Sequence, residues 1–363
     1  MKRLVLLGGG HAHVHVLDAL ARARLPDTAV TLISPEPRQW YSGMLPGWIA
    51  GHYRLEQCAI DLVRLTQRAG CTFRQTHATG LDLDTRTVLC ADGVPQPFDW
   101  LSIDVGPTTA TEAIEGADAH ALAVRPIASF VAAIEGILAG ATEAPGAPVA
   151  IVGAGAAGVE LAFALRHRCP STPIALIGTT PRPLDGLPGL LQLRVRHLMA
   201  ERSIAWHGAS RAVAVDANGV HLASGARIAA SRVLQVTGAA APAWPAAAGL
   251  ATDARGFIRV TPTLQSISHP AVFAAGDVAA YAEPRPKSGV FAVRAGPPLA
   301  QNLRRAVLGQ SLAPWSPQRR ALYLLSTGDG HALGAWGPLG WWGDWVWRWK
   351  DRIDRRFMAR FGA

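Results

Sequence analysis

The chain has 363 residues, of which 49% are hydrophobic, and its formal net charge at pH 7 is +9. This length and composition suit two or three folded domains and exclude an intrinsically disordered protein. The four cysteines stand far apart without a C-x-x-C motif, so we expect neither a disulfide framework nor a zinc site. The arginine-rich excess of positive charge favours anionic partners such as nucleotides or phospholipid head groups. No run of eighteen apolar residues is present, which predicts no transmembrane helix.

The first pattern along the chain is an apolar run at residues 4–7, followed by three glycines at 8–10 and a helical pattern to Leu17. It predicts a buried strand, a tight turn and a helix, which is the layout that binds a dinucleotide. Glycines let a pyrophosphate approach the backbone, and the helix N-terminus offers it free N–H groups. The match is imperfect, because the third glycine of the G-x-G-x-x-G pattern is replaced by His13.

Between residues 18 and 70, three segments bear on a cofactor site. The strand predicted at 29–33 ends in Ser34, and Glu36 follows two places later than a ribose-binding acid would stand. Residues 39–48 form a loop that is unusually aromatic and apolar, so it either lies against a flat ring or is tucked into the core. Residues 54–69 have a helical pattern.

A second copy of the glycine pattern covers Val149–Leu161 and matches the fingerprint in full. A small-residue linker at 139–148 precedes it, and an apolar strand at 173–177 follows its helix. No carboxylate follows that strand to bind the ribose 2′-hydroxyl of NAD, whereas Thr179 and Arg182 suit the 2′-phosphate of NADP. Two such turns indicate two cofactors, or one cofactor and a relic.

Three further predicted strands end in glycines. The strands at 98–105 and 231–236 each lead into one, and a third ends in Gly276-Asp277. Ligands of α/β folds bind at the carboxyl ends of strands, so Asp277 is a candidate for holding a ribityl hydroxyl of a flavin. The alternative is a simple turn.

These pieces, in this order, resemble flavoproteins of the pyridine nucleotide-disulfide oxidoreductase superfamily. The matching segments are residues 8–13, 151–162, 236–238 and 263–277. The resemblance implies an α/β fold with two nested Rossmann-like three-layer domains, in which an NAD(P)H domain is inserted into an FAD domain. The implied boundaries are 1–120 and 241–310 for the FAD domain, 121–240 for the inserted domain and 311–363 for a C-terminal tail.

Within this superfamily the chain looks closer to type II NADH dehydrogenases and sulfide:quinone oxidoreductases. It looks closest to the flavoprotein module that is fused in front of selenide, water dikinase, through Gly8-Gly-Gly-His-Ala-His, Tyr41-Ser-Gly-Met-Leu-Pro-Gly and residues 285–298. It departs from its relatives in three respects. It lacks the cysteine pair of disulfide reductases, the two glutamines of type II dehydrogenases and the late cysteine of sulfide:quinone oxidoreductases.

The motifs and the resemblance together give a set of expected site residues. Those expected to bind FAD are Gly8, Gly9, Gly10, His11, His13, Ser34, Glu36, Ser42, Gly43, Met44, Leu45, Pro46, Asp104, Gly106, Gly276, Asp277, Val290 and Phe291. Those expected to bind NAD(P)H are Gly153, Gly155, Gly158, Thr179, Arg182 and Gly238. Glu160 is expected to orient the nicotinamide or to mediate protons near the ring. Lys287 either stabilises the anionic reduced flavin or is a solvated surface lysine.

The histidines of the first helix raise the question of a metal ion. Of His11, His13 and His15, only the first and last share a helix face, so we predict no metal site.

Six of the twelve tryptophans lie between Trp336 and Trp349. At helical spacing a single apolar stripe contains Trp342, Trp345, Val346, Trp349, Ile353, Phe357 and Phe361, and the charged residues lie mostly outside it. A tryptophan face opposite a basic face is typical of a helix in a membrane interface. We therefore favour peripheral membrane association through 336–361, with packing on the protein itself or on a partner as the alternative.

These observations predict an FAD-dependent oxidoreductase that takes a hydride from NAD(P)H and passes electrons onward, with a membrane quinone as the favoured acceptor. The expected location is the cytoplasm or the cytoplasmic face of the membrane. One alternative is an FAD enzyme that acts on a reduced sulfur or selenium species, and another is a non-catalytic flavin-binding partner module. We do not expect nucleic-acid binding, because aromatic and basic residues are not interleaved as on an RNA-binding surface.

Overall fold

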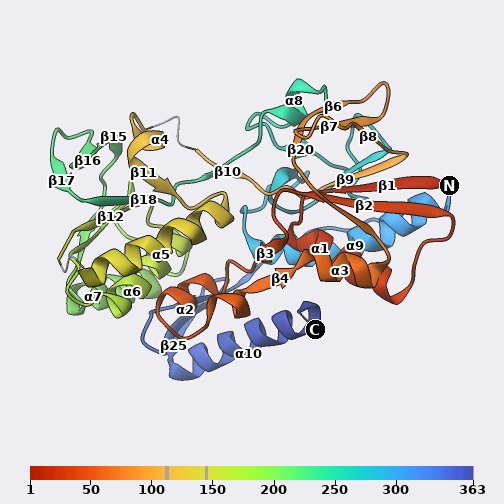
Figure 1. Ribbon diagram of the computed structural model, residues 1–363. Helices are drawn as coiled ribbons and strands as arrows, with labels where there is room; N and C mark the ends of the chain where they lie inside the picture. The colour runs from red at the N-terminus through yellow and green to blue at the C-terminus, as the bar shows by residue number, and fades with distance from the viewer. Residues whose placement is uncertain (111–113, 144–145, 363) are drawn as a thin grey trace.

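Two parallel five-stranded sheets organise the computed structural model, which describes residues 1–110, 114–143 and 146–362 (Figure 1). The first sheet has the order β21-β9-β1-β2-β5 and the second has the order β11-β18-β12-β13-β14. The strands of the first sheet are β1 (Lys2–Leu7), β2 (Thr28–Ser34), β5 (Thr72–Gln75), β9 (Trp100–Ile103) and β21 (Val272–Ala274). Those of the second are β11 (Ala121–Ala123), β12 (Val149–Val152), β13 (Ile174–Ile177), β14 (Ile204–His207) and β18 (Arg232–Gln235). The predicted α/β fold class is confirmed.

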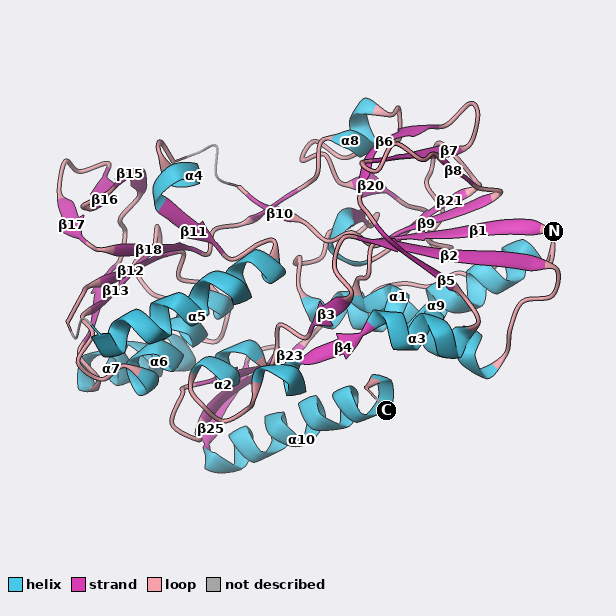
Figure 2. Ribbon diagram, in the orientation of Figure 1, coloured by secondary structure: helices cyan, strands magenta, loops and turns pink. Residues whose placement is uncertain are grey.

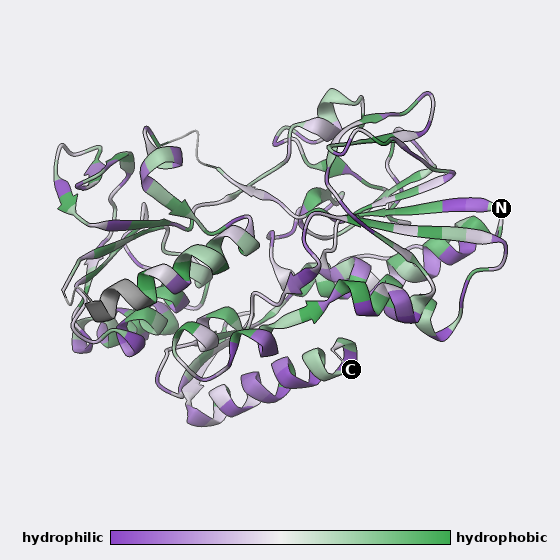
Figure 3. Ribbon diagram, in the orientation of Figure 1, coloured by the Kyte–Doolittle hydropathy of each residue, from purple (hydrophilic) through white to green (hydrophobic). Residues whose placement is uncertain are grey.

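The first sheet is buried on both faces, as parallel sheets generally are. Residues 4–7 of β1 are all buried, and Figure 3 shows this strand changing from purple at its exposed N-terminal end to green. The helices α1 (His11–Arg22), α3 (Leu62–Ala69) and α9 (Gly289–Val307) cover one face. The other face is covered by α8 (Trp244–Ala247) and by an antiparallel sheet of β6 (Ala78–Asp82), β7 (Thr87–Cys90) and β8 (Gln96–Pro97).

The second sheet is layered in the same way. The helices α5 (Ile127–Glu143), α6 (Ala156–Arg168) and α7 (Gly189–Glu201) pack on one face. The other face is covered by α4 (Ala117–His120) and by an antiparallel sheet of β15 (Ala212–Asp216), β16 (Gly219–Leu222) and β17 (Arg227–Ala229). The linker predicted at 139–148 is wrong in its first half, because α5 continues to Glu143.

The chain passes between the two sheets twice, and the two crossings lie side by side. They are β10 (Thr108–Thr109) and β19 (Ala239–Ala240), which pair antiparallel between the two halves of the molecule (Figure 2). Near the second crossing, β20 (Ile258–Arg259) pairs with β22 (Ala279–Ala280), which follows the short 3-10 helix η2 (Gly276–Val278). These pairings bring the strand-end glycines of both sheets toward the middle of the molecule.

The segment from 38 to 61 differs from the expectation. β3 (Arg38–Trp40) pairs antiparallel with β4 (Ala59–Asp61), and α2 (Leu45–Ile49) and the 3-10 helix η1 (Leu55–Cys58) lie between them. The helix predicted at 54–69 is therefore wrong for its first half. α3 begins only at Leu62, because the Asp61 carboxylate accepts a hydrogen bond from the Arg64 N–H and caps the first turn.

The tail contains more structure than the predicted helix. β23 (Leu322–Ser326), β24 (Ala332–Trp336) and β25 (Leu339–Gly343) form an antiparallel sheet, and α10 (Asp344–Phe361) follows it. Trp342 is thus a strand residue. The predicted stripe is divided, because Val346 and Phe361 are buried against the protein. α10 runs along the lower side of the molecule in Figure 1, beneath α2 and β4. Within the described part of the chain, no helix is both long enough and apolar enough to span a membrane.

Candidate functional site

The first glycine turn packs tightly against the end of β9. Gly8 has a φ of +95°, and a Cβ placed there would overlap the main chain of Asp104. A Cβ on Gly10 would overlap the Asp104 carboxylate itself. Glycine is therefore required at both positions by the protein's own packing.

His13, which replaces the third glycine of the pattern, joins this turn to β9. Its imidazole is fully buried, with Nδ1 donating to the Gly8 carbonyl at 2.6 Å and Nε2 lying 2.8 Å from the Ser102 hydroxyl. Burial lowers the pKa of His13 to about 4, so the ring is neutral at pH 7. The departure from the glycine pattern is thus compensated by two hydrogen bonds that hold the turn in place.

Asp104 lies under the first turn of α1. Its Oδ2 accepts hydrogen bonds from the N–H groups of Ala12 at 2.8 Å and His13 at 3.0 Å. Burial, with a smaller contribution from the neighbouring Asp277, raises the pKa of Asp104 to about 7. The Asp277 carboxylate lies 4.0 Å from the guanidinium of Arg125, which the sequence did not single out.

Several polar atoms around this turn fit a bound dinucleotide. The Ser288 hydroxyl and the His11 Nε2 are buried, and neither has a hydrogen-bond partner among the described residues. Both lie at elements that the sequence assigned to the cofactor, namely the start of α9 and the start of α1. Ligand oxygens are the kind of partner that such atoms require. FAD bound here would be held by the turn at 8–10, by Asp277 and by the start of α9.

The remaining residues expected at the flavin differ in burial. Ser42 and Glu36 are exposed, and the buried Ser34 hydroxyl donates to the Glu36 carbonyl. The other buried members of the set are Gly9, Met44, Leu45, Pro46, Gly276 and Phe291, while Gly43, Gly106 and Val290 are partly exposed. Because Met44 and Leu45 belong to the hydrophobic core, the second half of the aromatic loop is tucked into the protein.

The Lys287 side chain is held in place by two contacts close to the Gly276-Asp277 turn. Its ammonium donates to the Ala279 carbonyl at 2.5 Å and lies 3.9 Å from the centre of the Phe257 ring. Burial lowers the pKa of Lys287 to about 8, partly offset by Asp277. The lysine is therefore not fully solvated, and its role toward a flavin stays a prediction.

The glycines of the second turn differ in their surroundings: two are packed against main-chain atoms, and one has free space beside it. A Cβ on Gly153 would overlap the Val236 carbonyl, and a Cβ on Gly158 would overlap the Gly153 carbonyl. At Gly155 no described atom lies within 4 Å of the Cβ position, and the residue is exposed. Gly155 therefore leaves space that a dinucleotide can use. Thr179 and Arg182 follow β13, Gly238 follows β18, and all three residues are exposed; these two strands lie on either side of β12 in the same sheet.

Glu160, on α6, belongs to a buried cluster of ionisable side chains. Its carboxylate accepts a hydrogen bond from the Ser326 N–H at 2.8 Å, and the positive charge of Lys350 stabilises its ionised form. The Lys350 ammonium donates to Asp354 at 2.7 Å and to the Gly43 carbonyl at 2.6 Å. We call Glu160, Lys350, Asp354 and Tyr41 the buried ionisable cluster.

Burial sets the protonation of this cluster. It raises the pKa of Glu160 to about 7, although Lys350 and the Ser326 N–H act in the opposite direction. Tyr41 donates from its hydroxyl to Asp354 at 3.1 Å, and burial raises its pKa, so it stays protonated. A carboxyl with a pKa near 7 can release and accept a proton at neutral pH. The sequence singled out Glu160 but not Lys350, which is one of the charged residues outside the predicted apolar stripe.

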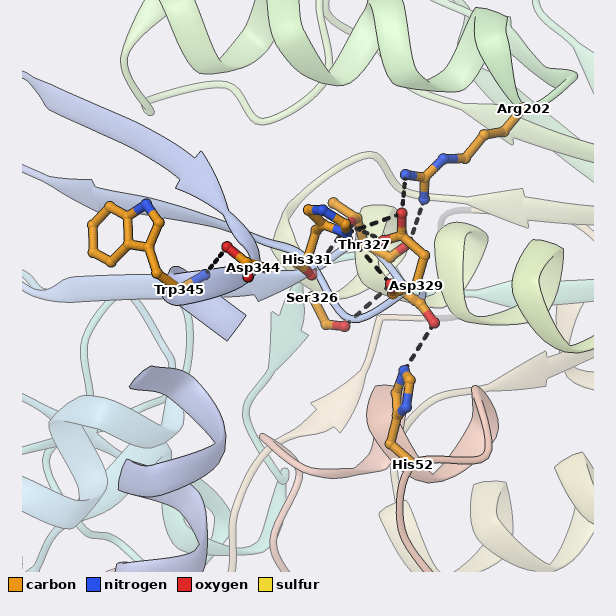
Figure 4. Close-up of polar contacts among 9 residues, drawn as sticks. His52, Arg202, Ser326, Thr327, Asp329, His331, Asp344 and Trp345 are labelled. Atoms are coloured by element: carbon orange, nitrogen blue, oxygen red, sulfur yellow. Dashed lines mark hydrogen bonds and ion pairs between the residues drawn. The ribbon is translucent and has the colours of Figure 1, made fainter. Parts of the chain in front are cut away.

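A loop of the tail sheet holds the Ser326 N–H against α6. Figure 4 shows Asp329 in this loop, paired with Arg202 at 2.6 Å and hydrogen bonded to the Thr327 hydroxyl. The His52 ring lies 2.9 Å from the Gly328 carbonyl of the same loop. The N–H donor to Glu160 is therefore fixed by contacts to α7 and to the segment after α2.

The four cysteines are not paired with one another. Burial raises the pKa of the Cys58 thiol to about 12 and that of the Cys71 thiol to about 11. Burial also raises the pKa of Cys90 and Cys169. A raised pKa keeps a thiol in its unreactive protonated form. This chemistry gives no support to a cysteine-based sulfur mechanism.

The tail presents an apolar surface. On α10, Trp345, Trp349 and Ile353 have exposed fractions of 38–50%, and we call them the tryptophan surface. The rings of Trp345 and Trp349 stack with centroids 6.5 Å apart. The Arg194 guanidinium of α7 lies over the Trp342 ring at 5.8 Å. Trp342 on β25 is exposed as well, and exposed apolar groups of this kind mark a candidate binding surface.

Known proteins resemble this chain along most of its length. NADH dehydrogenase-like protein Rv1812c of Mycobacterium tuberculosis is 28% identical over 303 residues, which cover 77% of this chain and 73% of that protein. NADH dehydrogenase-like protein YutJ of Bacillus subtilis is 29% identical over 212 residues, 56% of each chain.

Solved structures share the fold. The sulfide:quinone oxidoreductase of Aquifex aeolicus superposes with a TM-score of 0.83 at 21% identity, covering 99% of this chain and 91% of that chain. NDH2 of Plasmodium falciparum also has a TM-score of 0.83, at 15% identity, with 98% and 97% covered. The closer likeness to the module fused to selenide, water dikinase stays a prediction.

The profile of the pyridine nucleotide-disulphide oxidoreductase family matches residues 2–302. This match includes both glycine turns, the Gly-Asp pair and most of α9. The chain belongs to the pyridine nucleotide-disulphide oxidoreductase family, with FAD as its cofactor and NAD(P)H as the co-substrate.

Proposed function

We propose that the protein takes a hydride from NAD(P)H, through FAD, and reduces a quinone at a membrane surface. The observation that carries this proposal is the buried ionisable cluster, in which Lys350 of α10 is hydrogen bonded to the Gly43 carbonyl and acts electrostatically on Glu160 of α6. NADH dehydrogenase-like relatives and a quinone-reducing structural neighbour support the same reaction class. FAD, when bound, supplies the coupling between a two-electron donor and the acceptor.

The proton balance gives the cluster a role. Oxidation of NAD(P)H releases two electrons and one proton, whereas reduction of a quinone to a quinol consumes two electrons and two protons. One further proton must therefore reach the acceptor from the protein. Glu160 suits this task, because its pKa is about 7 and its carboxyl is buried beside Lys350.

Binding of the nicotinamide nucleotide is assigned to the second glycine turn. The open space at Gly155 lies at the start of α6, where the helix N-terminus favours a pyrophosphate. The exposed Thr179 and Arg182 at the end of β13 suit an additional 2′-phosphate, and no carboxylate stands there. These residues favour NADPH over NADH.

The tryptophan surface supports access from a membrane. Indole rings are favoured at the membrane–water boundary, and the exposed Arg348 and Arg352 on α10 can meet anionic head groups. A quinone dissolved in the bilayer would then approach the protein from the side on which α10 lies.

The domain boundaries are part of the same proposal: residues 121–240 would bind NAD(P)H, and residues 1–120 and 241–310 would bind FAD.

The decisive experiment is an anaerobic titration of the purified flavoprotein with NADPH and then with NADH, monitored by flavin absorbance. We expect bleaching at a lower concentration of NADPH than of NADH, and recovery of the absorbance when a quinone is added. Bleaching without recovery would contradict the quinone as acceptor. No bleaching by either nucleotide would overturn the donor, and would leave a reduced sulfur or selenium substrate or a non-catalytic flavin module.

A further inference from the structure

Asp104 occupies most of the donors at the N-terminus of α1. The first turn offers four backbone N–H groups, those of Gly10, His11, Ala12 and His13. The Asp104 carbonyl accepts from Gly10 at 3.1 Å, and its Oδ2 accepts from Ala12 and His13. Of these four groups, only the N–H of His11 is not taken by Asp104.

The carboxyl is enclosed by glycines on two sides. A Cβ on Gly10 or on Gly276 would overlap the Asp104 carboxylate, and Gly276 has a φ of +70°. Asp104 has an exposed fraction of only 2%. Two of the glycines in the cofactor motifs are thus needed to make room for this side chain.

A dinucleotide brings its pyrophosphate to the same helix N-terminus. An ionised Asp104 and the pyrophosphate would then be two anions in one buried turn, competing for the same N–H groups. Two negative groups that share a buried site do not both stay ionised, and the weaker acid takes up a proton. The carboxyl is a far weaker acid than the phosphodiester oxygens of FAD.

We propose that Asp104 is protonated in the flavin-bound protein and donates a hydrogen bond toward the pyrophosphate, so that FAD binding takes up one proton. The proposal rests on FAD binding at the first glycine turn. In balance, the ionised protein, one proton and FAD give the protonated protein with FAD bound, and no covalent bond other than the O–H bond is formed.

The groups that face Asp104 are consistent with this coupling. His11 and His13 on α1 have pKa values lowered by burial to about 4, so neither supplies a compensating positive charge at pH 7. Asp277 adds negative charge, and it is Asp277 that lies near Arg125 and Lys287. The Tyr281 hydroxyl stays protonated, because burial raises its pKa. A proton on Asp104 itself is therefore what relieves the repulsion.

The test is the retention of FAD by the full-length flavoprotein between pH 5.5 and 9. Released flavin is measured after dilution and ultrafiltration at each pH. Without FAD, burial places the pKa of Asp104 at about 7, so retention should be constant below that pH. Above it, the dissociation constant should rise by up to about tenfold per pH unit.

D104N has a side chain of nearly the same shape as Asp104 but cannot ionise, so the dissociation constant of FAD from this variant should not change with pH. D277N should weaken FAD at every pH and keep the slope.

A direct measurement on the wild type does not depend on the folding of a variant. FAD is rebound by the full chain at pH 8 in weak buffer, and the proton uptake is followed with a pH indicator. Uptake of about one proton per FAD supports the proposal. FAD binding without uptake, or an equal slope in D104N and the wild type, overturns it. A protein that binds no FAD at any pH would instead refute the assignment of the cofactor.

Discussion

Lys350 and Gly43 are 307 residues apart in the chain, yet the lysine ammonium donates a hydrogen bond to the glycine carbonyl at 2.6 Å. The same ammonium is paired with Asp354, and both side chains are at least nine-tenths buried. This contact ties the last helix to the loop that the sequence assigns to the flavin. The stability of the fold and the geometry of the site therefore depend on the same lysine.

Replacing Lys350 with methionine should lower the free energy of unfolding by about 3–5 kcal/mol, because Asp354 is then left buried without an opposite charge and keeps only its hydrogen bond from Tyr41. Unfolding in urea with linear extrapolation measures this change. Replacing both Lys350 with methionine and Asp354 with leucine should recover most of the loss. The control is Arg348→Met, which breaks the exposed pair with Asp344 and should cost less than about 1 kcal/mol. Equal losses in Lys350→Met and Arg348→Met would contradict the importance of burial.

Glu160→Gln should abolish a loss of stability that the wild type shows between about pH 4.5 and pH 7. The folded protein binds the Glu160 proton more tightly than the unfolded chain, whose pKa is about 4.5. This contribution to stability is complete below that value and is lost as the pH rises through about 7. The glutamine variant should therefore gain stability relative to the wild type between pH 5 and pH 8.5, by up to about 3 kcal/mol.

The same substitution should flatten the pH profile of acceptor reduction, which in the wild type should fall as Glu160 loses its proton. Steady-state rates with a soluble quinone between pH 5.5 and 8.5 measure this effect. The control is Glu56→Gln, at an exposed carboxylate of η1, which should leave the profile unchanged. A wild-type rate that is constant across this range would rule out Glu160 as the proton donor.

Gly155→Leu should prevent reduction by NAD(P)H while FAD stays bound. The Cβ position at Gly155 has no described atom within 4 Å, so the fold tolerates the side chain, which then fills the space of the pyrophosphate. We expect the nucleotide concentration needed for bleaching to rise at least about a hundredfold. Gly136→Leu on α5, another position with open space, is the matched control and should bleach normally. Normal bleaching of the Gly155 variant would mean that the nucleotide binds elsewhere.

The double change Trp345→Ser and Trp349→Ser should abolish flotation with anionic liposomes. The two rings are partly exposed and stacked, so serine removes apolar area from the surface, although it also removes the stacking of Trp349 on Trp341. The same number of exposed apolar residues is removed in the control, Leu89→Ser with Val94→Ser, which should still float. Truncation before Trp336 is not a clean test, because it also removes the buried Lys350. Flotation of the tryptophan variant equal to that of the wild type would point to a protein partner.

The glycine turns show how far the sequence determines the fold. An apolar run followed by glycines locates β1 and α1, and β12 and α6, because local sequence dictates the turn and the helix start. The sequence did not predict the tail sheet. The residues from Trp336 to Trp349 have the spacing of an apolar helical stripe, but in the structure they form the end of β24, all of β25 and the start of α10. The helix expected at 54–69 was wrong in its first half, because β4 forms there through its pairing with β3, and right in its second half, where α3 lies.

The candidate site was predictable where it follows strand ends, and not where distant segments meet. Asp104 and Asp277 could be proposed from their positions after buried strands. Sequence could not show that Asp104 caps α1, because that contact joins residues more than ninety positions apart. A lysine at position 350 in a basic helix gives no sign of burial, although lysine is rare in this chain. Its burial depends on Asp354 and the Gly43 carbonyl both being in place.

During synthesis of the chain, the partners that complete this site are made later than the glycine turns. β9 gains its outer neighbour only when Val272–Ala274 has been synthesised, and Glu160 gains its Ser326 partner later still. Lys350 leaves the ribosome after both. A nascent chain can therefore form the strands and helices around each glycine turn well before its proton-bearing groups are in position. Assembly of the complete site waits until Lys350 has been synthesised.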